Sequence, residues 1–120
     1  MLRVVSAIAN GGTLNEPSML GVSENKTTLL SSSTATKIAS MMNYNVTYKY
    51  GKSTFSGLDI SGKTGTAEVG KGQASHGWFV GFLNDEEHPY AFVVLVEHGG
   101  SGLGAAGAVA NTVLNYAVKK

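Results

Sequence analysis

The sequence predicts a single α+β domain in which an antiparallel three-stranded meander is packed by helices. Two observations favour this fold class. Three runs typical of strands follow one another through short loops, and apolar residues recur at helical spacing before and after them. A chain of 120 residues has room for one domain and can bury about two-thirds of its surface, so a modest core is possible.

Three helices are expected, near residues 2–10, 33–43 and 103–118. The first ends at the glycines after Asn10, and the last ends in two lysines that complement a helix C-terminus. The second begins after a run of serines, which are good N-caps. Its apolar stripe consists of Ala35, Ile38, Ala39, Met41 and Met42. The segments 13–31 and 43–57 are polar, so we predict a connection in the first and an exposed loop in the second.

The three strands are expected at residues 58–69, 76–83 and 90–97. The last two are rich in aromatic and β-branched residues, and the turn between them is polar and ends at Pro89. Short turns join antiparallel neighbours. A sheet of this size must bury one face against a helix, which predicts core positions for Trp78, Phe79, Phe82, Phe92 and Val94.

Composition excludes several kinds of function. The net charge is +1 and the lysines are dispersed, whereas nucleic-acid binding needs a clustered basic patch. The chain has no cysteine, which excludes thiol catalysis, disulfides and cysteine-based metal sites. No stretch approaches the roughly 20 apolar residues of a membrane helix.

One short stretch, GLDISGKT at residues 57–64, satisfies the phosphate-loop pattern GxxxxGK[ST]. A phosphate loop needs a helix that starts at the Lys-Thr pair, because the amides at its N-terminus hold the phosphate. The residues that follow, 64–70, contain glycines and β-branched threonines and favour a strand. A nucleotide-binding module is therefore only a remote alternative.

The same lysine can hold a different anion. Lys63 on a strand can attract a substrate carboxylate, and a hydroxyl from Thr64 or Thr66 can hydrogen-bond it. Gly65 leaves room for a substrate backbone to pass close by. The stretch thus predicts a peptide-carboxylate site.

Three longer stretches carry a family resemblance: GKTGTAEVG, then HGWFVGF, then AFVVLVEHGGSG before the last helix. Together with the opening MLRVVSAIANGG, they resemble the C-terminal segment of the transpeptidase domain of class B penicillin-binding proteins. The resemblance covers nearly all 120 residues. It implies that residues 1–120 are the C-terminal portion of a single, incomplete domain of the penicillin-binding transpeptidase and β-lactamase-like fold.

The resemblance also implies an activity, D,D-transpeptidation in peptidoglycan cross-linking, and implies no metal and no cofactor. Substrate-binding roles fall to Lys63, Thr64, Gly65 and Thr66, and the backbone N–H of Thr66 is expected to be one oxyanion donor. Strict strand alternation puts the side chains of Lys63 and Thr66 on opposite faces. Either the strand lies at a sheet edge with local twist, or only some of these side chains face the cleft.

The family's nucleophile motif, S-x-x-K, and its S-x-N motif both precede Lys-Thr-Gly by a long distance. The only candidate in this chain is SENK, where Ser23 and Lys26 fit S-x-x-K and Ser23 with Asn25 fits S-x-N. No apolar stripe follows it that could bury a helix, so we expect the nucleophile to be absent and the isolated chain to be inactive. The first helix also lacks a capping box, which suggests a start within a larger domain.

Two other groupings are better explained as structural. Ser75, His76 and Asp85 could form a hydrolase triad, but adjacent residues on a strand point to opposite faces. His76, His88 and His98 could bind a metal, but they include no closely spaced ligand pair.

The expected partners of the parent enzyme are a peptidoglycan stem peptide and β-lactams, at the extracytoplasmic face of a bacterial plasma membrane. The isolated chain would need the upstream half of its domain as a partner. A non-catalytic interaction fragment is the main alternative, because uncovered sheet edges and helix faces favour homo-oligomers or complementation.

Overall fold

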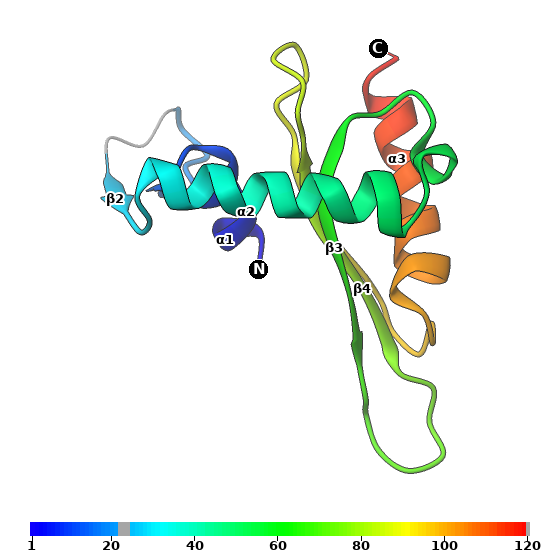
Figure 1. Cartoon of the computed structure of the whole chain (residues 1–120). Helices are drawn as coiled ribbons and strands as arrows, with labels where there is room; N and C mark the ends of the chain where they lie inside the picture. Colours follow the sequence, from blue (N-terminus) through cyan, green and yellow to red (C-terminus); the bar gives the residue numbers. More distant parts are fainter. Residues whose placement is uncertain (22–24, 120) are drawn as a thin grey trace.

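The computed structural model describes residues 1–21 and 25–119 of the chain (Figure 1). The helices and helical turns are α1 (Leu2–Ala9), α2 (Ser32–Tyr44), η1 (Asn45–Lys49), η2 (Lys52–Phe55), η3 (Gly102–Gly107) and α3 (Ala108–Ala117). The strands are β1 (Thr13–Asn15), β2 (Lys26–Thr28), β3 (Ile60–Ala67), β4 (His76–Leu83) and β5 (Ala91–Val96). The α+β class and the three predicted helices are confirmed.

The predicted meander is also confirmed. β3, β4 and β5 form an antiparallel sheet in that order, so β4 is central and β3 is an edge strand of the described sheet. Lys63 lies opposite Val80, and Thr64 lies opposite Phe79. Figure 1 shows the β3–β4 hairpin reaching well past the helices at one end.

Helices cover both faces of this sheet, and the side chains of β4 alternate between two cores. The α3-side core comprises Val46, Phe55, Ile60, Phe79, Leu83, Ala106, Ala110 and Leu114. The α1-side core comprises Val5, Met42, Val80 and Phe82. A strand buried on both faces explains why HGWFVGFL is an almost continuous apolar run.

The predicted core residues are largely confirmed. Phe79 and Phe82 are buried, whereas Trp78, Phe92 and Val94 are half-buried at the margins of the two cores. The prediction for the methionines was half wrong. Met42 is buried but the adjacent Met41 is 64% exposed, because neighbouring residues on a helix point about 100° apart and only one can face the sheet.

The segment 43–57 is not the exposed loop that its polar composition predicts. Ser31 caps α2 by accepting a hydrogen bond from the N–H of Thr34, and the helix then continues through a wide turn, η1, into the short helix η2. Val46 and Phe55 from this segment are buried in the α3-side core. Burial of these two side chains outweighs the loop-favouring composition around them.

The connection 13–31 contains a short hairpin that the sequence did not predict. β1 and β2 pair antiparallel, with Leu14 opposite Thr27 and buried. Strands of three residues are too short to show a period. None of the helices in the described residues is long and apolar enough to cross a membrane.

Candidate active site

The four residues predicted to bind substrate all lie in β3. The register puts Lys63 and Gly65 beside Val80 and Trp78, on the face of the sheet that α1 and α2 cover. Thr64 and Thr66 share the opposite face with Phe79. The side chains of Lys63 and Thr66 therefore point to opposite faces, as strict alternation predicts. The feature that the four residues share is their position on an edge strand.

The hydrogen bonds of Thr64 show which backbone groups face the open edge of β3. Its N–H donates to the hydroxyl of Tyr50 at 3.1 Å, and the ammonium of Lys63 donates to its carbonyl at 2.6 Å. Both backbone groups of Thr64 thus point away from β4. Since this direction repeats every second residue, the N–H and C=O of Thr66 also point to the open edge. A backbone donor at Thr66 does not depend on where its side chain points.

The start of η3 lies in close backbone contact with β3 near these residues. η3 begins at Gly102, and a Cβ built there would lie 2.4 Å from the carbonyl oxygen of Gly65 and 2.9 Å from that of Trp78. The hydroxyl of Ser101 caps η3 by accepting from the N–H of Gly104. Only glycine allows this approach, so Gly102 fixes the distance between η3 and the strand.

A cavity of about 330 Å³ adjoins Lys63 on the α1 side. Lys63, Thr64 and Gly65 line it together with apolar side chains from Met1, Trp78 and Val80. It therefore pairs one exposed cation with an apolar wall, the type of surface that a short peptide with a carboxylate can occupy.

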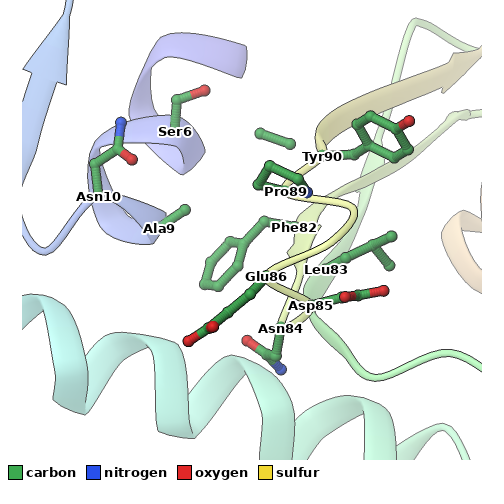
Figure 2. Close-up of a pocket in the computed structure, with 11 residues that line it drawn as sticks. Ser6, Ala9, Asn10, Phe82, Leu83, Asn84, Asp85, Glu86, Pro89 and Tyr90 are labelled. Carbon is green, nitrogen blue, oxygen red and sulfur yellow. The ribbon is translucent and has the colours of Figure 1, made fainter.

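A separate pocket of about 350 Å³ lies between the end of α1 and the β4–β5 turn, as Figure 2 shows. Phe82 and Leu83 contribute apolar side chains, and Asn10, Asn84 and Glu86 contribute polar ones. Asp85 also lines it. The hydrogen bond from the side chain of His88 is the main cause that lowers the pKa of the Asp85 carboxyl, followed by one from the N–H of Glu87. This pocket shares no residue with the Lys63 cavity.

The hydrolase triad is not assembled. Nδ1 of His76 accepts from the N–H of His98 at 2.9 Å, whereas Asp85 contacts His88 at 2.8 Å. His76 begins β4 and Asp85 follows its end. The three histidines do not form one cluster either, because His76 contacts His98 whereas His88 contacts Asp85. The described residues contain no group of three potential metal ligands.

The SENK motif falls partly outside the described residues, because Ser23 and Glu24 are not among those that the structure describes. Of its remaining residues, Lys26 begins β2 and is exposed. The phosphate-loop pattern is contradicted, since Lys63 and Thr64 continue a strand instead of starting a helix.

The sequence did not identify Tyr50 as a neighbour of the site. A signal was available, because Met42, Val46 and Tyr50 recur every four residues and so continue the buried stripe of α2. The polar residues between these three made the segment read as a loop, so this spacing was not used.

Known proteins resemble this chain in sequence and in fold. Residues 1–115 match the family described as penicillin binding protein transpeptidase domain. An alignment over 59 residues shows 39% identity to the peptidoglycan D,D-transpeptidase PbpA of Mycolicibacterium smegmatis, and it covers 47% of the chain and 12% of that protein.

Solved structures show the same similarity over nearly the whole chain. A putative peptidoglycan glycosyltransferase from Atopobium parvulum aligns with 98% of the chain at a TM-score of 0.80 and 25% identity. Penicillin-binding protein A from Mycobacterium tuberculosis, solved as an imipenem acyl-enzyme complex, aligns with 98% at a TM-score of 0.73 and 25% identity. The chain spans 32% and 29% of those two proteins.

Proposed function

Because the chain belongs to the penicillin-binding protein transpeptidase domain family, we propose that it supplies the substrate-binding edge strand of a peptidoglycan D,D-transpeptidase. The observation that supports this most directly is the position of Lys63, Thr64, Gly65 and Thr66 on the open edge of β3. A peptide can pair with such an edge by its backbone.

Each of the four residues has a chemical role in this proposal. Lys63 attracts the terminal carboxylate of a D-Ala-D-Ala stem peptide, and Thr64 offers a hydroxyl to it. Gly65, which carries no side chain, lets the peptide pass close to the strand. The N–H of Thr66 donates to the oxyanion, a contact typically worth about 100- to 1,000-fold in rate. A β-lactam would occupy the same positions.

The reaction requires a nucleophile that we place in polypeptide outside these 120 residues. A serine oxygen attacks the carbonyl between the two D-alanines, the C–N bond breaks, and the terminal D-alanine leaves with the proton. The amine of a second stem peptide then attacks the serine ester and restores the hydroxyl. Ser23 is not assigned this role, because no apolar stripe follows it to bury a helix.

Labelling with a fluorescent penicillin tests the proposal. The complete polypeptide encoded by the reading frame that holds these residues should be labelled, whereas the 120-residue chain should not. Lys63→Ala in the complete polypeptide should slow labelling, with Lys71→Ala in the exposed β3–β4 loop as the matched control. A complete polypeptide that resists labelling while it remains folded would exclude the proposed activity.

A second candidate is a non-catalytic interaction fragment that oligomerises or complements another fragment. Exposed apolar side chains support it: Leu2 and Val4 on α1, and Val113 and Tyr116 on α3. Light scattering should then report a homo-oligomer, or a heterodimer with the upstream half of the domain. A monomer that unfolds cooperatively would count against it.

The parent enzyme is proposed to act at the extracytoplasmic face of the bacterial plasma membrane, because its substrate is peptidoglycan. A protease added to intact spheroplasts should cleave the complete polypeptide there. Complete resistance, with cleavage only after lysis, would place it in the cytoplasm.

A further inference from the structure

Side chains cover part of the open edge of β3. The residues whose backbone groups point away from β4 are the even-numbered ones, as the contacts of Thr64 show. At Ile60 the edge carbonyl accepts from the side-chain amide of Asn43 on α2 at 3.2 Å. The covered part of the edge thus begins at Ile60 and includes Thr64.

Tyr50 makes the decisive contact at Thr64. Its hydroxyl lies 3.1 Å from both the backbone nitrogen and the side-chain oxygen of Thr64. The tyrosine itself is held in place, because its N–H donates to the carbonyl of Asn45 at 2.9 Å. Its ring also packs edge-on against Phe79, with 6.3 Å between ring centroids.

The two partners of Thr64 differ in mobility. Lys63 has an exposed, flexible side chain and can exchange the carbonyl of Thr64 for a substrate carboxylate. Tyr50 is half-buried against the α3-side core and has no such freedom. The N–H of Thr64 therefore remains covered when a ligand binds, and the N–H of Thr66 is the next free donor along the edge.

We propose that Tyr50 sets the register at which an extended peptide pairs with β3, by covering the N–H of Thr64 so that pairing begins at the N–H of Thr66. This inference rests on the proposed function, since it assumes a peptide substrate. It goes further by assigning a positioning residue outside the Lys-Thr-Gly-Thr stretch.

Strand geometry predicts how the peptide binds when this register is lost. The alternative pairing position is two residues away, or about 7 Å. A peptide bound there keeps its backbone hydrogen bonds but holds its scissile carbonyl out of reach of the Thr66 N–H. Such binding is nonproductive, so it lowers kcat and KM by the same factor and leaves kcat/KM unchanged.

Steady-state kinetics of the complete polypeptide with an N-acylated D-Ala-D-Ala peptide test this. Tyr50→Leu should lower kcat and KM together by roughly fivefold, the equivalent of one backbone hydrogen bond. Tyr50→Phe keeps the ring against Phe79 but lacks the hydroxyl, so it should lower kcat and KM in the same way while preserving the packing. Tyr48→Leu is the matched control, because Tyr48 lies in the same segment and is 70% exposed. A Tyr50→Leu enzyme that loses kcat/KM, or changes neither constant, would overturn the proposal.

A second measurement covers the case in which Tyr50→Leu does not fold. With threonine labelled by ¹⁵N in the wild-type complete polypeptide, the peptide should shift the amide resonance of Thr66 and leave that of Thr64 nearly in place. Equal shifts at both amides would overturn the proposal.

The two proposals fail in different ways. A wild-type polypeptide that neither turns over the peptide nor reacts with penicillin contradicts the proposed function. A wild-type polypeptide that does both, with kinetics indifferent to Tyr50, contradicts only the register role.

Discussion

The imidazole of His76 accepts a hydrogen bond at 2.9 Å from the backbone N–H of His98, which joins the start of β4 to the turn after β5. The acceptor is Nδ1, so that nitrogen carries no hydrogen. His98 has a positive φ of 53°, and its own Nδ1 donates to the carbonyl of Ala74 at 3.1 Å. The two histidines thereby hold the base of the β3–β4 loop next to the glycine-rich turn that leads to η3.

Removing this acceptor should loosen the end of the sheet. His76→Phe keeps a ring but leaves the N–H of His98 without its partner, so we expect the free energy of unfolding to fall by about 1 kcal/mol. Urea unfolding followed by circular dichroism measures it. His98→Gly is the companion variant, since glycine adopts positive φ freely and still offers the N–H to His76. His76→Phe as stable as the wild type would show that the bond contributes nothing.

Phe79 should be the costliest single truncation in the sheet. Its side chain is 0% exposed and packs against Phe55 and Phe92, each with 5.2 Å between ring centroids. Phe79→Ala should lower the free energy of unfolding by about 3–5 kcal/mol. Leu95→Ala on neighbouring β5 is the control, because Leu95 is 42% exposed. Similar losses from the two variants would contradict the assignment of Phe79 to the core.

The strands were predictable and part of their surroundings was not. β4 and β5 are apolar runs bounded by polar turns, and short turns permit only antiparallel neighbours. The β-branched threonines and glycines of residues 64–70 favour a third strand, which includes Thr66 and adjoins Lys63. That this strand lies at an edge depends on pairings between residues far apart in the chain, which a local pattern does not contain.

The unpredicted features share a physical cause. Tyr50 and Phe55 lie in a polar segment, and their burial is decided by the core that they meet. The close approach of Gly102 to Gly65 is a backbone contact across 37 residues, and a glycine-rich run in a sequence looks the same whether or not another segment lies against it. Tertiary contacts of this kind override local preference.

Acid should weaken the β4–β5 turn through Asp85. The hydrogen bond from His88 holds the pKa of this carboxyl below its ordinary value of 3.8, so the folded state binds the proton less readily than the unfolded state. The stabilisation is therefore complete above pH 3.8 and is lost as pH falls through the lowered value. Thermal unfolding between about pH 5 and 2 should show a shallower acid dependence for Asp85→Asn than for the wild type. Identical curves would mean that the contact is not formed in solution.

Nucleotide should have no effect on stability. Lys63 and Thr64 lie in a strand, so their amides do not converge on a phosphate as those of a helix N-terminus do. Addition of Mg²⁺ and ATP should leave the melting temperature unchanged in both the wild type and Lys63→Ala. A rise in the wild type alone would restore the phosphate-loop interpretation.

Two glycines of η3 should respond oppositely to alanine. At Gly102 a Cβ would lie 2.4 Å from the carbonyl of Gly65, and since that atom is backbone it can be relieved only by moving η3 or β3. At Gly104 the nearest atoms belong to the side chain of Ser101, at 3.3 and 3.4 Å, and that side chain can adjust.

Gly102→Ala should therefore cost about 1–3 kcal/mol in the free energy of unfolding, the usual penalty of overpacking. Gly104→Ala should be neutral or stabilising, because alanine is favoured over glycine in a helix by up to about 1 kcal/mol. Denaturant unfolding of both variants measures the difference. In the complete polypeptide Gly102→Ala should also slow penicillin labelling, because η3 holds the carbonyl of Gly65 one residue before the proposed oxyanion donor, Thr66. Equal stability of the two alanine variants would show that η3 does not fix the position of β3.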